Sequence, residues 1–146
     1  MKLRTSLAAA GAAVVLAATG ALVLPAVASA HGTTHTLKFI AVQKGTVGFT
    51  RATGGLQNTD VNTLGKTIGF DMLYFAATSP SSLAVNYTLD TKGGFLYGTF
   101  TFNPRTGVVT NGKVTGGTGA FAGATGTIKV KTISRTKHAV TITYSG

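Results

Sequence analysis

Beyond Ala30, the chain consists of short stretches in which apolar and polar residues alternate. In the stretch Thr36 to Gln43, apolar Leu37, Phe39 and Ala41 occupy every second position, and a period of two is typical of a β-strand. Comparable stretches follow, separated by residues that favour turns. They lie at Lys66 to Ala77, Leu83 to Thr91, Phe95 to Phe102, Val108 to Thr115, Thr127 to Ile133 and Ala139 to Tyr144.

The segment Lys44 to Thr67 departs from this pattern because it is polar and rich in glycine. We predict a long loop here, with one weak strand at Thr46 to Thr50. The chain then has seven or eight strands, and no segment after Ala30 has a helical period of useful length. Strands joined by short turns predict an all-β, antiparallel, eight-stranded up-and-down barrel, since closure removes exposed strand edges. Such a barrel holds side chains or one small ligand.

A glycine-rich stretch separates two of the expected strands, Val108 to Thr115 and Thr127 to Ile133. We interpret it as a tight corner of the closed sheet, because glycine permits positive φ angles and close approach of the backbone. Phe121 is expected to pack beneath the corner as a plug. The corner residues are Gly116, Gly117, Gly119, Phe121, Gly123 and Gly126.

The first thirty residues have the pattern of an export signal. Lys2 and Arg4 precede an apolar stretch from Leu7 to Leu24, and Ala28-Ser29-Ala30 forms a small-residue cleavage site. We therefore predict a signal peptide at residues 1–30, a single mature domain at residues 31–146 and a secreted protein. A membrane anchor is the alternative, because the apolar stretch is long enough for one.

Charge and composition narrow the classes of function. Thirteen basic residues face three acids, all aspartates, and the chain has no cysteine. The net charge of +10 becomes +8 once Lys2 and Arg4 are removed. Basic residues are scattered rather than clustered with aromatics, which argues against nucleic-acid binding. They suit a solvated surface or attraction to an anionic cell-surface polymer.

Motifs for metals and cofactors are absent from the sequence. The spacing Gly107-x-x-x-x-Gly112-Lys113 resembles a phosphate-binding loop, but Val114 stands where a hydroxyl residue is needed. We expect no cofactor and no metal site. One alternative is copper bound at a mature N-terminal His31, with His35 or His138 as a further ligand.

The corner also carries a family resemblance. The pattern Gly116-Gly117-x-Gly119-x-Phe121-x-Gly123-Ala124-x-Gly126 resembles the late-strand signature of the allene oxide cyclase and dirigent barrel superfamily. Gly65-Lys66 and Gly98-Thr99-Phe100 look similar to other parts of dirigent proteins. The resemblance covers about Gly65 to Tyr144. It implies an eight-stranded, calycin-like barrel with an apolar cavity, and a homodimer or homotrimer.

The family's chemistry transfers poorly to this sequence. The resemblance places Ala41 and Gln43 at the positions of the cyclases' glutamate and a nearby amide. It places Asn103 and Thr110 at the positions of an aspartate and an arginine of dirigent proteins. The family's acids are thus missing, and whether the chain is an enzyme stays open; if it is one, the resemblance implies a cyclase-like isomerase.

Asp71 is the strongest candidate for a residue that takes part in catalysis or ligand binding, because it interrupts an apolar stretch. An inward Asp71 would have a perturbed pKa, but an outward, solvated orientation is favoured. The full set of candidate ligand-binding residues is Gln43, Asp71, Tyr74, Asn86, Tyr87 and Tyr97.

Three functions remain open from the sequence. The first is a cavity that binds a small hydrophobic molecule and steers its cyclisation or coupling. The second is a binding barrel without catalysis. The third is a cell-surface interaction protein whose cavity is filled by Phe39, Phe70, Phe75 and Phe100.

Overall fold

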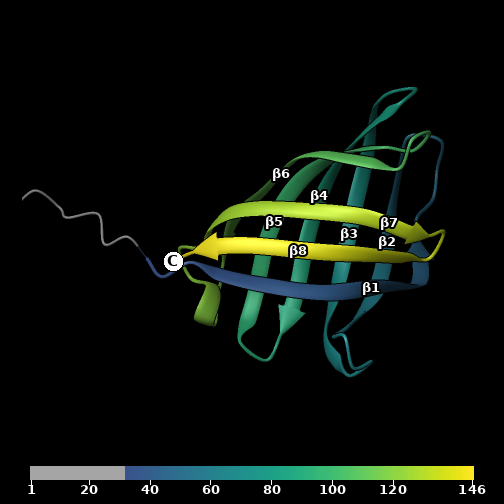
Figure 1. Ribbon diagram of the computed structural model, residues 1–146. Helices are drawn as coiled ribbons and strands as arrows, with labels where there is room; N and C mark the ends of the chain where they lie inside the picture. Colours follow the sequence, from purple (N-terminus) through teal and green to yellow (C-terminus); the bar gives the residue numbers. More distant parts are fainter. Residues whose placement is uncertain (1–31) are drawn as a thin grey trace, which may run out of the picture. The chain divides into compact units, whose positions relative to one another are not determined.

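The computed structural model describes residues 32–146, and this part of the chain forms one closed antiparallel barrel (Figure 1). The predicted signal peptide, its cleavage site and His31 lie outside the described residues. No helix within the described part is long and apolar enough to cross a membrane. The strands are β1 (His35–Val47), β2 (Thr53–Val61), β3 (Thr67–Ser79), β4 (Ser82–Thr91), β5 (Gly94–Asn103), β6 (Val108–Gly117), β7 (Thr125–Ser134) and β8 (Lys137–Ser145).

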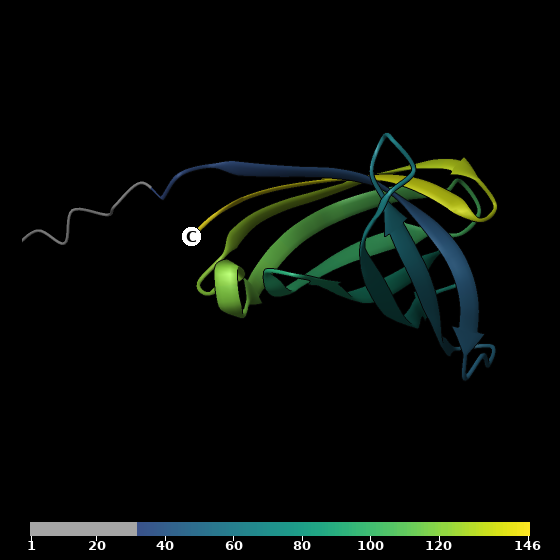
Figure 2. The ribbon, with the colours of Figure 1, turned by 90° about the horizontal axis from the view of Figure 1, so that it is seen from below.

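Each strand pairs with its neighbours in sequence, and β8 returns to pair with β1. Figure 2 shows the strands curving around a common interior. The predicted all-β, eight-stranded up-and-down barrel is therefore confirmed. Closure satisfies the backbone groups that would otherwise be exposed at two sheet edges.

One strand differs from the sequence prediction. The prediction of a weak strand at Thr46 to Thr50 is wrong, because β1 continues to Val47 and the chain then turns through Gly48, whose φ is +59°. The second strand is instead β2, within the segment predicted as a loop. Its inward residues include Gly54, Asn58 and Asp60, so it lacks the apolar alternation that reveals the other strands.

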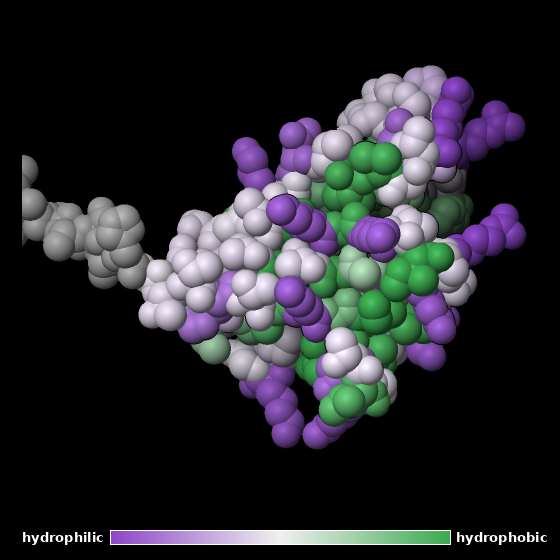
Figure 3. Space-filling view, in the orientation of Figure 1, coloured by the Kyte–Doolittle hydropathy of each residue, from purple (hydrophilic) through white to green (hydrophobic). Residues whose placement is uncertain are grey.

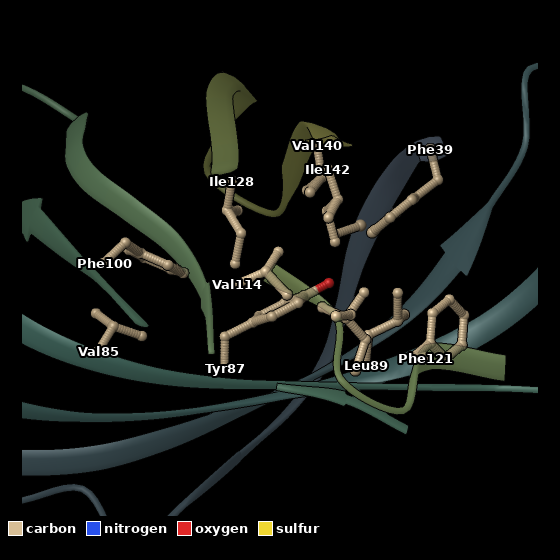
Figure 4. Close-up of a cluster of buried hydrophobic side chains, with 13 residues drawn as sticks. Phe39, Val85, Tyr87, Leu89, Phe100, Val114, Phe121, Ile128, Val140 and Ile142 are labelled. Carbon is tan, nitrogen blue, oxygen red and sulfur yellow. The ribbon is translucent and has the colours of Figure 1, made fainter. Parts of the chain in front are cut away.

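The end of the barrel where β1 begins and β8 ends is filled with apolar side chains (Figure 4). The glycine-rich corner closes this end through a short 3-10 turn, Gly119–Phe121. Phe121 is 5% exposed and meets the ring of Tyr144 edge-on at a centroid distance of 5.4 Å. The buried apolar residues are Phe39, Ala41, Val85, Tyr87, Leu89, Leu96, Phe100, Val114, Phe121, Ala124, Ile128, Val140 and Ile142.

The corner depends on glycine at the points of closest approach. A Cβ atom on Gly126 would collide with the carbonyl oxygen of Thr143 on β8, and one on Gly117 would collide with Phe121. Gly119 and Gly123 have φ angles of +59° and +75°, in the region that disfavours other residues. Close packing here is what lets the corner cap the barrel.

The outer face of the barrel is mixed in character. Figure 3 shows hydrophilic side chains projecting between apolar patches on one side of the molecule. On β3, Phe70, Met72 and Tyr74 point outward and are more than half exposed. Phe70 therefore does not contribute to the interior.

We predict that Phe121→Ala lowers the free energy of unfolding by about 3–5 kcal/mol, since it leaves a cavity at the closed end. Chemical denaturation measures this change. Phe70→Ala is the matched control, and should cost about 1 kcal/mol or less because that ring is largely exposed. Equal costs for the two variants would contradict the role of Phe121 as the plug.

Candidate functional site

A cavity of about 330 Å³ occupies the half of the barrel opposite the closed end. It reaches the connections β1–β2, β5–β6 and β7–β8 through Phe49, Pro104 and Arg135. Its walls are mainly apolar side chains contributed by all eight strands. The lining residues on the strands are Ala41, Gln43, Leu56, Asn58, Asp71, Leu73, Phe75, Leu83, Val85, Tyr87, Phe100, Phe102, Val109, Val130, His138 and Val140.

Two strands bring a polar group together inside this apolar wall. Asn58 on β2 lies opposite Asp71 on β3, and its Nδ2 donates a hydrogen bond of 2.6 Å to Asp71 Oδ1. Asp60 lies two residues further along β2 on the same inner face and is 0% exposed. Because residues two apart on a strand share a face, these three side chains are fixed by the sheet register rather than by a loop.

The two carboxyl groups perturb one another. Burial, together with the neighbouring charge of Asp71, raises the pKa of Asp60 to about 9. Burial also raises the pKa of Asp71, to about 6, although the hydrogen bond from Asn58 opposes the rise. Near pH 7 the pair therefore holds one proton and one negative charge.

Tyr87 on β4 extends the polar group toward the middle of the barrel. Its side chain is 3% exposed, and Figure 4 shows its hydroxyl among the buried apolar residues. Burial, with the charges of Asp71 and Asp60, raises its pKa well above the ordinary value, so the phenol stays neutral. Among the described residues, the buried Tyr87 hydroxyl, Asp71 Oδ2, Asn58 Oδ1 and both carboxyl oxygens of Asp60 have no hydrogen-bond partner.

The mouth of the cavity carries different polar groups. Gln43 and His138 line it from β1 and β8, and Arg135 lines it from the β7–β8 turn. His138 lies opposite Ala41 in the β1–β8 ladder, and its Nδ1 is 3.4 Å from Thr132 Oγ1. Burial lowers the pKa of His138 below its ordinary 6.5, so the ring is neutral near pH 7.

The six candidate ligand-binding residues separate into two groups. Gln43, Asp71 and Tyr87 line the cavity. Tyr74, Asn86 and Tyr97 occupy alternate positions on β3, β4 and β5, where their side chains point outward and are exposed. The inward position of Asp71 corrects the outward orientation favoured from the sequence; its neighbours Leu73 and Phe75 face the same cavity.

Sequence reasoning missed Asn58, Asp60, Arg135 and the cavity position of His138. Asn58 and Asp60 lay in the segment assigned to a loop, although the spacing Asn58-x-Asp60 places both on one face of a strand. Within residues 32–146, no group of three or more histidine, cysteine or acidic residues is arranged to hold a metal ion. The copper alternative depends on His31, which is outside the described residues.

The fold is similar to that of three solved structures. A pyocyanin demethylase aligns with a TM-score of 0.63 at 15% identity, covering 76% of this chain and 100% of the other. The exo-specific intermolecular Diels-Alderase AbnU aligns at 0.61 and 12% identity, covering 79% and 100%. The pterocarpan synthase dirigent protein GePTS1 aligns at 0.55 and 15% identity, covering 78% and 89%.

These alignments establish the architecture. The chain has the dirigent-like barrel fold, as the glycine corner predicted. No family model and no curated protein matches the sequence. At 12–15% identity, the comparison concerns the fold and leaves the chemistry to the residues of this cavity.

We predict that Asp60→Asn flattens the pH dependence of stability between about pH 7 and about pH 9. A carboxyl group whose pKa is raised in the folded state binds protons that the unfolded chain releases, so its contribution to stability falls as the pH rises toward 9. Asp71 and His138 titrate below this window. Thermal unfolding midpoints across the window measure the slope.

Asp90→Asn is the control for this prediction, because Asp90 is an exposed aspartate on the outer face of β4. It should retain the wild-type slope. If Asp60→Asn and the wild type lost stability equally between about pH 7 and about pH 9, Asp60 would not be the group that holds the proton.

Proposed function

We propose that the barrel binds a small hydrophobic molecule in its cavity and steers a rearrangement such as cyclisation, with Asp71 as the acid–base group. The observation that carries this proposal is the Asp71 side chain, which lines a mainly apolar cavity and whose buried Oδ2 has no hydrogen-bond partner. A pKa of about 6 gives it the range in which a carboxyl group can both accept and donate a proton near neutral pH.

The surroundings of Asp71 support a catalytic role. Asn58 fixes one oxygen of Asp71 by a hydrogen bond, and the other oxygen has no hydrogen-bond partner. Asp60 is buried on the same inner face, and near pH 7 the two carboxyl groups hold one proton between them. Burial and the charges of Asp71 and Asp60 keep the Tyr87 phenol neutral. Apolar walls exclude water and hold the reacting groups of one substrate in a fixed orientation.

The names of the similar structures are consistent with this proposal. One describes a Diels-Alderase and another a dirigent protein, and both names concern reactions of small organic molecules. Their fold alone transfers no residue roles, because the identities are low. The support for chemistry comes from the Asp60–Asp71 pair of this chain.

A binding barrel without catalysis is the second candidate, favoured by the predominance of apolar residues in the lining.

The third function considered from the sequence, a cell-surface interaction protein, requires aromatic side chains to fill the interior. Phe75 and Phe100 instead form parts of the cavity wall, and Phe70 points outward. The cavity of about 330 Å³ that remains favours a bound ligand.

A general probe of a desolvated carboxylate base tests the catalytic proposal. We expect the protein to accelerate the base-catalysed ring opening of 5-nitrobenzisoxazole, in which a base removes a carbon-bound proton and a coloured nitrophenolate forms. The rate should rise with pH through about 6 as Asp71 loses its proton. Absorbance of the product measures it.

Asp71→Asn should reduce this acceleration about 100-fold or more, because general-base catalysis contributes ~10²–10⁴-fold. Asp90→Asn, on the outer face, should leave it unchanged. Saturable binding of the probe without an Asp71-dependent rate would support the binding barrel instead. An absence of binding would contradict both candidates.

A further inference from the structure

The distribution of charge at the two ends of the cavity is strongly asymmetric. The open end of the barrel carries exposed basic residues, which we call the cationic rim: Lys44, Arg51, Arg105, Arg135 and Lys137. The chain has only three acids. Asp60 and Asp71 are buried, and Asp90 lies on the outer face near the far end of β4. No acid therefore neutralises the rim.

One member of the cationic rim also lines the cavity. Arg135 contributes to its wall together with Gln43 and His138. A guanidinium binds a carboxylate through two parallel hydrogen bonds. The Gln43 amide adds donors beside it, and the neutral ring of His138 adds one more group able to donate. This arrangement suits a planar anionic group at the mouth.

The deep part of the cavity, in contrast to the rim, disfavours an anionic group. Asp71 lies there with Asp60, and near neutral pH the pair carries a negative charge that the apolar walls do not screen. A ligand anion would be repelled from this position and attracted to the rim. The two ends together thus determine which end of an asymmetric ligand enters first.

From this asymmetry we infer that the ligand is an amphiphilic monoanion, an apolar ring system with one carboxylate that remains at Arg135 while the opposite, uncharged end reaches Asp71. This inference rests on the proposed binding of a small hydrophobic molecule. The cavity of about 330 Å³ is near the lower limit for ligand pockets, which suits one or two fused rings. A polymer would be confined to the outside of the rim.

The test compares two probes of nearly equal shape, 2-naphthoate and the uncharged 2-naphthamide, by calorimetric titration of the purified protein. We expect one molar equivalent of each to bind, with naphthoate about 10-fold tighter, because hydrogen bonds to a charged partner are roughly twice as strong as neutral ones. Arg135→Gln should reduce this preference to within about 2-fold.

Lys129→Gln is the matched control, because it also removes one positive charge but lies on the outer face of β7, opposite Thr141. It should preserve the preference for naphthoate. Equal binding of the two probes, or a preference that survives Arg135→Gln, would overturn the inference while leaving the proposed function intact. Failure of both probes to bind would overturn the proposed function as well. Binding of polyphosphate without binding of naphthoate would assign the rim to polymers and overturn the inference.

Discussion

Two aspartates buried side by side impose the strongest physical constraint on this barrel. An isolated ionised carboxylate is very costly to bury, and two adjacent ones cannot both be ionised without a large penalty. The barrel accommodates Asp60 and Asp71 by keeping one proton between them and by the hydrogen bond from Asn58. The walls nearest the pair are mainly apolar, so its charge is weakly screened there.

The architecture divides the barrel into a packed half and a hollow half. Phe121 and the glycine corner close the first half, where the core supplies most of the apolar burial. The second half has fewer filling side chains and opens among the connections that carry the cationic rim. Because Asn58, Asp60 and Asp71 lie on strands of the closed sheet, their positions are determined by backbone pairing. Sites built on strands hold their geometry more closely than sites on loops.

Much of the fold could be predicted from the sequence, because most strands bury an apolar residue at every second position. The strand β2 could not, since its inward residues are Gly54, Leu56, Asn58 and Asp60, of which only Leu56 has a large apolar side chain. The same feature concealed the site. Polar residues that face a cavity break the pattern by which strands are recognised, so this functional strand had the weakest sequence signal.

The inward position of Asp71 was equally hard to predict, because both faces of β3 carry apolar residues. Periodicity alone could not decide which face is interior. The resemblance to allene oxide cyclases and dirigent proteins placed Ala41 and Asn103 at positions where those proteins carry an acid. In the structure Ala41 lies directly opposite Asp60 in the β1–β2 ladder, and Asn103 organises the β5–β6 turn through its Oδ1. The two buried acids of this barrel, Asp60 and Asp71, thus lie on β2 and β3 rather than at the positions of Ala41 and Asn103.

The most direct test of this account is a carbon-13 NMR titration of the aspartate carboxyl groups, which is simplified by the presence of only three aspartates. The account predicts that two of the three resonances titrate far above the ordinary value of 3.8, with midpoints of about 6 and about 9. Substitution of Asp71 should shift the higher midpoint downward, because the charge of Asp71 raises it. If Asp60 and Asp71 both titrated near 3.8, the shared proton and the acid–base role assigned to Asp71 would both be contradicted.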